Sequence, residues 1–470
     1  MQQWRTPSRP PHPRSDDVGR SDDGGSAMTA GTQGTRNGLL DRPDAAPPGA
    51  SALSHACAPT QPGDVSGTPS STAPGQRENA RLTGIDAARG VALFGMMAIH
   101  VMDPVGPGGG PSLTWDLAAG RSAALFALLA GVGVAFTTGR RNPPAGRAWA
   151  AHAASLFVRA LLIAAVGLLL GYLVPRNLAG VILPYYAVLF VLAIPLVLLP
   201  VRTLVGTAAA IAIGMPVLSH LLRAGEAMVT EPNYSFTQLV QQPGQVFRDL
   251  VLTGTYPALP WVAYLCVGLA VGRSLLSSRR VVVLMTLAGL GLAVGARLAS
   301  WLLLDVLGGR ADLEAVALAS RTQEDYTALL LWGPAGTTPT DTAWWLATMA
   351  PHSTTPLDLL STIGIGLAVL GVCILLGRTT TRGLRPIAAA GSMTLSLYCL
   401  HLLLLSSGRM PEDDLTSLLT QVVVVVGFAL LWSRSHVRGP LEEIVAQATG
   451  AVRRRVMAGA TTRGAGTRPD

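Results

Sequence analysis

The stretch RLTGIDAARGVALFGMMAIHVMD, residues 81–103, decides how the rest of the chain is interpreted. It is an apolar run with Asp86 and Arg89 near its start and His100 near its end. A helix that rises about 1.5 Å per residue would separate Arg89 from His100 by about 16 Å. That distance is a large part of the hydrocarbon core of a bilayer, which is about 30 Å thick. The stretch therefore predicts a membrane-spanning helix with polar groups toward both ends.

The composition indicates a polytopic membrane protein. Of the 470 residues, 49% are hydrophobic and only 13% are charged, whereas soluble domains carry about a quarter charged residues. The net charge of +8 is scattered between apolar segments and forms no patch with interleaved aromatics, so we expect no nucleic-acid partner. The four cysteines have no CxxC spacing, and we predict neither a disulfide framework nor a metal site.

Three regions differ in composition. Residues 1–80 are rich in Pro, Gly, Ser, Asp and Arg and are predicted to be a disordered cytoplasmic tail. This tail has no apolar h-region, so we expect no cleaved secretory signal. Residues 81–435 are the expected transmembrane domain, and residues 436–470 are the expected basic cytoplasmic C-terminal tail.

Apolar segments long enough to cross a bilayer recur through the middle region, which predicts an all-α bundle of about ten transmembrane helices. They are residues 84–103, 121–139, 153–174, 178–199, 203–222, 258–277, 281–304, 357–377, 386–406 and 415–433. Pro184 and Pro195 predict kinks in the fourth segment.

Arginine gathers in alternate connections, and the acidic residues gather in the others. Because short loops rich in positive charge stay in the cytoplasm, both termini are predicted to be cytoplasmic. Two outer connections, about residues 223–257 and 305–356, are long and contain Trp and Tyr. These aromatics either anchor the protein at the headgroup level or belong to a lid over an outward-facing pocket.

Ionisable residues within spanning segments are costly, so each is a functional candidate. Asp86 and Arg89 are three residues apart and share a helix face. They either form an ion pair that stabilises the start of the helix, or Arg89 attracts a phosphate or carbonyl group from the cytosol.

His100 is the candidate general base, since an imidazole near neutral pH takes up a proton readily. Asp103, three residues on, or His401 in the ninth segment would orient it. The alternative is that His100 lies at the membrane interface with its hydrogen bonds satisfied and has no catalytic role. His352 and His401 reach the same outer level by this topology, and Tyr398 lies one turn before His401.

Two further stretches carry candidates for ligand contact. Arg121 opens the second segment and either snorkels to the interface or contacts a substrate. Tyr256 and Trp261 lie in a Pro-rich helix start, which is either a broken helix lining a cavity or an ordinary aromatic-belt helix start.

Several motifs resemble those of membrane-embedded acyltransferases. RLTGIDAARGVALFGMMAIH is similar to the first-helix signature of two branches. One contains the catalytic domain of heparan-alpha-glucosaminide N-acetyltransferase and the bacterial YeiB-type proteins, and the other contains bacterial sugar O-acyltransferases. TYPALPWVAYLCVGLAVGR resembles the YPxLPW helix of the first branch, GSMTLSLYCLH its late-helix pattern, and GRSAALFALLAG and APHSTTPLDLL the corresponding parts of actinobacterial members. The resemblance covers residues 81 to about 433.

The resemblance implies transfer of an acetyl or other acyl group from cytosolic acetyl-CoA or another acyl-CoA to an extracytoplasmic glycan, glycolipid or small metabolite. A buried histidine, here His100, would be catalytic with Asp103 or His401. The expected donor-binding residues are Asp86, Arg89, Arg140, Arg141, Arg159, Tyr256 and Trp261. The expected acceptor-binding residues are Arg121, His352 and Tyr398.

The expected location is a bacterial plasma membrane, crossed many times, with the lipid bilayer as a partner and a homodimer left open. The alternative function is a proton-coupled transporter or exporter in which His100 relays protons and Arg89 binds an anion. A scaffold role is a third option, against which the presence of Arg89, His100 and His401 argues.

Overall fold

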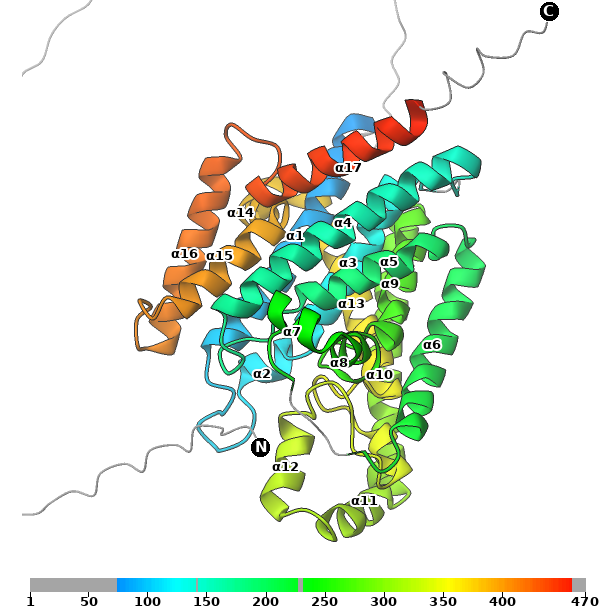
Figure 1. The fold of residues 1–470 in the computed structure, drawn as a ribbon, viewed down its shortest axis with the longest axis vertical. Helices are drawn as coiled ribbons and strands as arrows, with labels where there is room; N and C mark the ends of the chain where they lie inside the picture. Colours follow the sequence, from blue (N-terminus) through cyan, green and yellow to red (C-terminus); the bar gives the residue numbers. More distant parts are fainter. Residues whose placement is uncertain (1–73, 141–142, 227–230, 459–470) are drawn as a thin grey trace, which may run out of the picture. The chain divides into compact units, whose positions relative to one another are not determined.

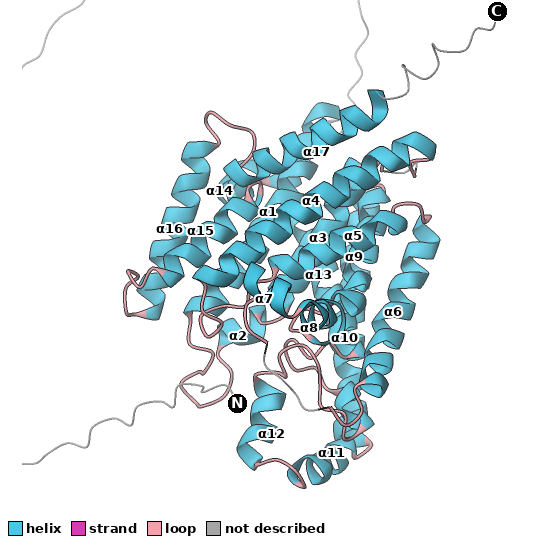
Figure 2. Ribbon diagram, in the orientation of Figure 1, coloured by secondary structure: helices cyan, strands magenta, loops and turns pink. Residues whose placement is uncertain are grey.

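The computed structural model describes residues 74–140, 143–226 and 231–458. This part of the chain consists of helices and loops and contains no β-strand (Figure 2). The all-helical expectation is therefore confirmed. Most of the predicted N-terminal tail, residues 1–73, lies outside the described residues, as do residues 459–470 of the predicted C-terminal tail.

Each of the ten predicted apolar segments coincides with a helix or a pair of helices (Figure 1). These are α1 (Pro74–Val101), α3 (Arg121–Thr137), α4 (Gly146–Leu173), α5 (Leu183–Leu196), α6 (Val201–Leu222), α9 (Ala258–Arg273), α10 (Arg279–Trp301), α13 (Pro356–Thr379), α14 (Thr381–Gly391), α15 (Thr394–Ser406) and α16 (Asp414–Trp432).

Shorter helices occupy the connections, and one further helix lies near the C-terminus. These are α2 (Leu113–Ala118), α7 (Phe236–Gln241), α8 (Pro243–Arg248), the π-helical turns η1 (Asp249–Thr253) and η2 (Leu302–Val306), α11 (Gly309–Leu318), α12 (Gln323–Leu331), the 3₁₀ turn η3 (Ala343–Ala347) and α17 (Pro440–Ala458).

In the described part, 7 helices are long and apolar enough to cross a membrane, and 9 spans result if two bent pairs each count as one. The pair Pro243–Thr253 and Ala258–Arg273 bends by 50°, and the pair α14 and α15 bends by 68°. The fourth predicted segment forms only the 14-residue helix α5, which ends just after Pro195. Proline removes a backbone donor and restricts the preceding turn, which accounts for the early end.

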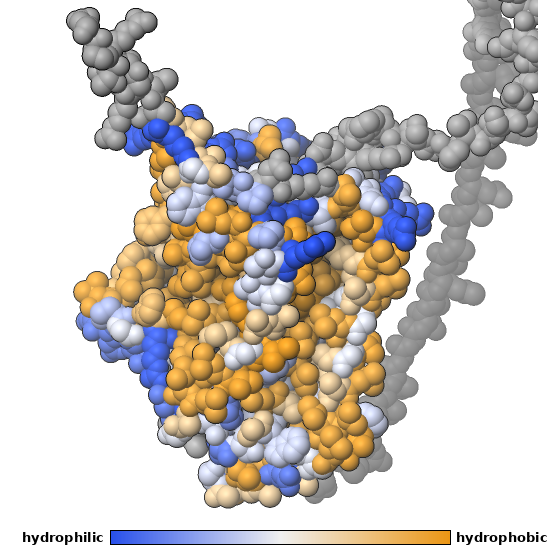
Figure 3. All heavy atoms as spheres, turned by 90° about the vertical axis from the view of Figure 1, so that its right-hand side faces the viewer, coloured by the Kyte–Doolittle hydropathy of each residue, from blue (hydrophilic) through white to orange (hydrophobic). Residues whose placement is uncertain are grey.

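The outward surface of these helices is apolar. Figure 3 shows hydrophobic side chains over most of the middle of one face, with hydrophilic ones gathered mainly near the top and lower left. On α10 the exposed side chains include Leu284, Leu287, Leu290 and Val294. A surface of this kind suits contact with lipid, and the chain is a multi-pass membrane protein by helix length and composition.

The two ends of the helical region differ. The end that we call the arginine end holds connections 138–145, 197–200, 274–278 and 433–439, together with α17. The opposite end, called the loop end, holds connections 102–112, 174–182, 223–257, 302–355 and 407–413. In Figure 1, α17 lies at the top, α11 and α12 lie at the bottom, and α2 lies between them in the lower half.

α1 packs closely against α14 because two glycines leave room. A Cβ on Gly90 would lie 2.2 Å from the carbonyl oxygen of Ile387, and a Cβ on Gly391 would overlap the carbonyl oxygen of Asp86. Real Cβ atoms do not come this close, so both positions require glycine. This contact explains the Arg-Gly pair in the first segment and brings α15, which follows α14, toward the end of α1.

α17 lies within the region expected to be a basic tail, and it packs along α4 (Figure 1). Arg147 Nε donates to the carbonyl oxygen of Val456 (2.8 Å), and Ser155 Oγ donates to that of Thr449 (3.1 Å). The Glu442 carboxylate accepts hydrogen bonds from the backbone N–H groups of Leu395 (2.6 Å) and Ser396 (3.2 Å). α17 therefore caps the first turn of α15.

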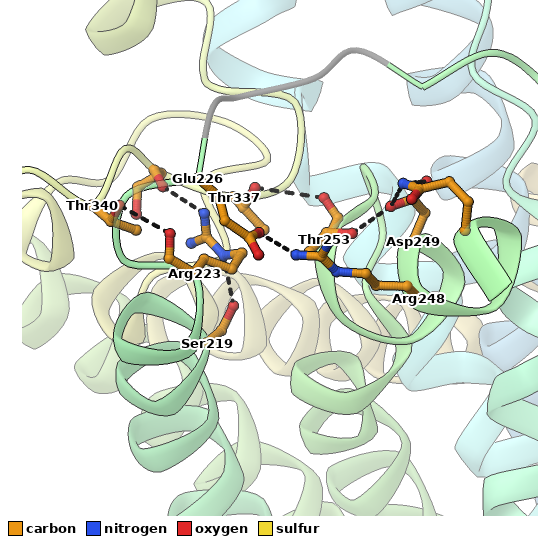
Figure 4. Close-up of polar contacts among 10 residues, drawn as sticks. Ser219, Arg223, Glu226, Arg248, Asp249, Thr253, Thr337 and Thr340 are labelled. Atoms are coloured by element: carbon orange, nitrogen blue, oxygen red, sulfur yellow. Dashed lines mark hydrogen bonds and ion pairs between the residues drawn. The ribbon is translucent and has the colours of Figure 1, made fainter.

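The two long connections at the loop end are joined by polar contacts (Figure 4). Arg223 donates from Nε to Ser219 Oγ (3.1 Å) and from Nη1 to the carbonyl oxygen of Thr338 (3.0 Å). Thr340 Oγ1 donates to the carbonyl oxygen of Arg223 (3.3 Å), and Thr337 Oγ1 to that of Thr253 (3.5 Å). These hydrogen bonds join the described parts of the two connections to each other and to the end of α6.

Candidate functional site

A chain of hydrogen bonds begins at His100 and continues into α15 and α16. His100 Nδ1 lies 3.0 Å from His401 Nε2, and His401 Nδ1 lies 2.6 Å from Gln421 Oε1. Gln421 Nε2 donates to Ser417 Oγ at 3.4 Å. The side chains of His401 and Gln421 are fully buried, whereas His100 is only partly buried. His100 is thus the accessible end of a buried polar chain.

With the Gln421 amide oxygen turned toward His401, one pair of histidine tautomers satisfies every hydrogen bond in this chain. The Gln421 oxygen accepts a hydrogen bond, so His401 Nδ1 carries its proton and His401 Nε2 has a lone pair. His100 Nδ1 must then donate to His401 Nε2, and the two rings lie nearly parallel, 5° apart. The remaining nitrogen, His100 Nε2, keeps a lone pair. The arrangement therefore presents a neutral imidazole that can accept a proton.

His401, and not Asp103, is the partner of His100. In the described structure, Asp103 Oδ1 accepts a hydrogen bond from the Val105 backbone (2.8 Å), and its own backbone N–H donates to Asp414 Oδ2 (2.9 Å). The helix ends at Val101, so Asp103 lies in the following loop and is not one helical turn above His100. The expected pair between Asp103 and His100 is not formed there.

Beside the histidines at the loop end lies a cluster of aromatic rings around Tyr256. Its ring meets those of Tyr185, Trp261 and His352 edge to face, with centroids 5.4, 5.3 and 5.3 Å apart respectively. Trp261 Nε1 and His352 Nδ1 are buried without a hydrogen-bond partner in the described structure. Buried polar atoms are normally paired, so these two are available to a bound ligand.

His352 lies in the loop before α13 with a left-handed backbone, φ 56°. Burial and the nearby Arg176 guanidinium lower the pKa of His352 to about 4. A lowered pKa keeps this imidazole neutral at physiological pH. His352 therefore contributes an uncharged polar group to the cluster.

The sequence analysis missed Arg176, which lies in the connection between α4 and α5. Its guanidinium is close enough to interact electrostatically with His100, His352 and Tyr256. One sequence signal is available for it: Arg176 falls on the side where acidic residues, not arginines, gather. Arginines in short loops usually set the orientation of a membrane protein by staying in the cytoplasm, and Arg176 lies on the opposite side. Its presence there is therefore not explained by orientation.

Tyr398 and Arg121 take up different positions around this site. The Tyr398 hydroxyl accepts a hydrogen bond from the Ile182 backbone (3.3 Å) and donates to the carbonyl oxygen of Gly180 (3.4 Å). Tyr398 therefore ties α15 to the connection that carries Arg176. Arg121 donates to the carbonyl oxygen of Ala119 (3.4 Å) and interacts electrostatically with Asp358 of α13. No described contact joins Arg121 to the histidine pair.

Nearer the arginine end, Arg89 Nη1 donates to Asp86 Oδ1 at 2.9 Å, the ion pair that was one of the two alternatives for these residues. Both side chains remain partly exposed, at 29% and 28%. Arg159 of α4 lies over the ring of Phe190, 4.6 Å from its centroid, and its buried Nε has no partner in the described structure. Arg89 and Arg159 interact electrostatically, so two cations lie close together here.

Arg140 lines a pocket of about 310 Å³ between the ends of α3 and α9. Its guanidinium lies 4.6 Å from the centroid of the Phe136 ring. Arg273 lines the same pocket and donates to the carbonyl oxygens of Val197 (2.6 Å) and Leu199. Arg141, the remaining predicted donor-binding residue, lies outside the described residues. The pocket therefore has a positively charged wall suited to an anion.

Comparison with known proteins gives one family. The model of "Heparan-alpha-glucosaminide N-acetyltransferase, catalytic" matches residues 81–298. No curated protein matches the chain. The matched range contains Arg89, His100, Arg176 and Tyr256, and it ends before α13. The expected resemblance is confirmed over this range and supports a membrane acetyltransferase family.

Proposed function

We propose that this chain transfers an acyl group, acetyl in the simplest case, from cytosolic acyl-CoA to a hydroxyl or amine on the other side of the membrane. The acceptor would be a glycan, glycolipid or small metabolite, and the membrane a bacterial plasma membrane. The observation that carries the proposal is the hydrogen-bonded pair of His100 and His401, because His100 lies in the helix that resembles the family's first-helix signature.

In this proposal the arginine end faces the cytosol, because arginine-rich connections stay there. Arg89, Arg159 and Arg140 bind the phosphates and the thioester arm of the donor through charge-assisted hydrogen bonds. Asp86 holds the Arg89 guanidinium in place while leaving its other nitrogens available. Tyr256 and Trp261 contact the acyl end of the donor.

At the loop end, His100 Nε2 takes the proton of the acceptor as the acceptor attacks the thioester carbonyl carbon. His401 and Gln421 hold the imidazole in the tautomer with a lone pair on that nitrogen, in the same way that a hydrogen-bonded third group orients the base of a catalytic triad. His352, Tyr398 and Arg121 contribute polar contacts to the acceptor. The proton returns to the departing CoA thiolate.

The test is acetyl transfer from radiolabelled acetyl-CoA in sealed membrane vesicles. His100→Ala is expected to lower the rate by about 10²- to 10⁴-fold, which is the usual contribution of a general base. His436→Ala is the matched control, because His436 stacks on Trp432 near the arginine end, 4.3 Å between ring centroids. Full activity of His100→Ala would contradict the assigned role.

The transporter alternative uses the same groups, with His100 relaying protons and Arg89 binding an anionic substrate. It predicts substrate movement that does not depend on acyl-CoA. CoA binding separates the two functions, because a ligand of the native state raises the melting temperature of the solubilised protein. A melting temperature that CoA leaves unchanged would favour transport.

A further inference from the structure

Two hydrogen-bond donors converge on one point beside Gly180, in the connection between α4 and α5. A Cβ placed on Gly180 would lie 2.9 Å from Arg176 Nη1 and 3.4 Å from the Tyr256 hydroxyl oxygen. Because both donor atoms lie so near this one point, they are also close to each other. An oxygen atom of a ligand placed between them would receive hydrogen bonds from a guanidinium and a phenol.

Both donors are held in place by neighbouring groups. Arg176 Nη2 donates to Thr255 Oγ1 (2.9 Å) and Nε to the carbonyl oxygen of Glu231 (3.3 Å). Neither bond uses Nη1, the nitrogen nearest Gly180. The Tyr256 ring is held between three other rings, as described above. Donors that are fixed before a ligand arrives need no reorganisation during a reaction.

The charge of Arg176 is not cancelled by a direct ion pair within the described part of the chain. The nearby Glu231 carboxylate accepts hydrogen bonds from Thr255 N (2.6 Å), from the Thr255 hydroxyl and from the Tyr185 hydroxyl (3.1 Å) instead. Thr255 therefore separates the carboxylate from the guanidinium. A cation in this setting interacts strongly with a negative charge that forms beside it.

The connection that carries Arg176 is fixed relative to His100. Asn233 accepts a hydrogen bond from Val181 N (2.8 Å) and donates to the carbonyl oxygens of Val174 (2.9 Å) and Ala179 (2.8 Å). Tyr398, one turn before His401 on α15, binds the same connection. The donor pair and the histidine pair thus share one rigid frame.

We propose that Arg176 and Tyr256 form the oxyanion site of the acyl transfer, an inference that rests on the proposed function. As His100 Nε2 takes the acceptor proton, the acceptor atom bonds to the thioester carbonyl carbon and the C=O electron pair moves to oxygen. The resulting oxyanion accepts hydrogen bonds from Arg176 Nη1 and the Tyr256 hydroxyl. When the C=O bond re-forms, the C–S bond breaks and the CoA thiolate takes the proton from His100.

The sharpest test is Gly180→Ala, which places a methyl group against Arg176 Nη1 and the Tyr256 hydroxyl, the two donors between which the oxyanion would lie. The backbone of Gly180 is not left-handed, and the nearest atoms belong to the flexible end of Arg176, so the variant is expected to fold. Loss of one oxyanion donor lowers kcat by about 10²- to 10³-fold, and we expect a loss of that order. The KM for acyl-CoA should change by less than about threefold, since the contact forms mainly in the transition state.

Gly206→Ala is the matched control, because a Cβ on Gly206 in α6 meets no atom within 4 Å. It is expected to retain the wild-type kcat. Arg176→Gln and Tyr256→Phe each remove one donor, and the double variant should lose less than the product of the two single losses, because both act on the same oxygen. In all these variants, CoA should still raise the melting temperature of the solubilised protein.

A wild-type kcat in Gly180→Ala or Tyr256→Phe would overturn the inference, as would a rise in KM at unchanged kcat. If Gly180→Ala misfolds, Tyr256→Phe decides the test, because this variant keeps the ring and its packing. Failure of the proposed function has a different signature: the wild-type protein itself would transfer no acyl group, and CoA would not change its melting temperature.

Discussion

The loop end and the arginine end both hold polar side chains, but they hold them in different ways. At the loop end, His100, His401 and Gln421 bond to one another across three helices. At the arginine end, Arg159, Arg140 and Arg273 are held separately, by aromatic rings and by backbone carbonyls. A set of mutually bonded groups acts as a unit, whereas separate cations contribute to binding one by one.

Among the tests of this comparison, the largest effect is expected from breaking the chain of hydrogen bonds at the loop end. His401→Ala removes the acceptor of the His100 Nδ1 proton, so the tautomer with a lone pair on Nε2 is no longer favoured. We expect kcat to fall by about 100-fold, within the range of general-base contributions. Rates of acetyl transfer as a function of pH provide the measurement, and the pH profile should shift as well.

Gln421→Leu sharpens this prediction, since it leaves His401 in place but removes the acceptor of its Nδ1 proton. A smaller loss, about tenfold in kcat, is expected, with a loss of about 1–3 kcal/mol in stability from the unpaired buried donor. The double variant should be no worse than His401→Ala alone. Independent effects of the two substitutions would show that the chain does not act as a unit.

At the arginine end the expected effects are smaller and additive. Arg89→Gln and Arg140→Gln should each raise the KM for acyl-CoA by about tenfold, since each removes one charge-assisted hydrogen bond. The effects of the two should multiply in the double variant. Arg202→Gln, on the exposed first turn of α6 at the same end, is the control. Strong coupling between Arg89 and Arg140 would remove the contrast between the ends.

The two ends are connected through α15, which Glu442 caps at its start and which carries His401 seven residues later. Glu442→Gln removes the charge from this cap and is expected to lower the free energy of unfolding by about 1 kcal/mol. Thermal melting of the solubilised protein measures the change.

Glu443→Gln is the control for this cap, because its exposed pair with Arg438, at 3.1 Å, should contribute little. Equal melting temperatures of the two variants would show that the cap does not stabilise α15.

A further prediction concerns pH. Because the pKa of His352 is about 4 in the folded protein and 6.5 ordinarily, the unfolded chain binds this proton more readily between those values. Stability therefore falls as the pH drops from about 6.5 toward 4. His352→Gln should lose less thermal stability than the wild type between pH 7 and pH 5. An identical loss in both proteins would contradict a buried neutral His352.

Hydropathy and spacing predicted most of the fold, because both are local properties. The apolar runs located ten helical segments, and the three-residue spacing placed Asp86 and Arg89 on one helix face, where they form an ion pair. Two features of the fold were not predicted. The 68° bend between α14 and α15 and the docking of α17 on α4 depend on contacts between segments distant in the sequence.

Some features of the candidate site could likewise be predicted from local sequence, and others depend on contacts between distant segments. By itself, the sequence determined that one helix carries Arg89 and, about 16 Å further along, His100, since a helix rises about 1.5 Å per residue. Only the tertiary structure decided that His100 bonds to His401, 301 residues away, instead of Asp103 three residues away. The close packing of Gly90 and Gly391 brings those helices together. The tertiary structure also decided that Arg176 lies near the histidines, because the contacts that place a loop residue come from segments distant in the sequence.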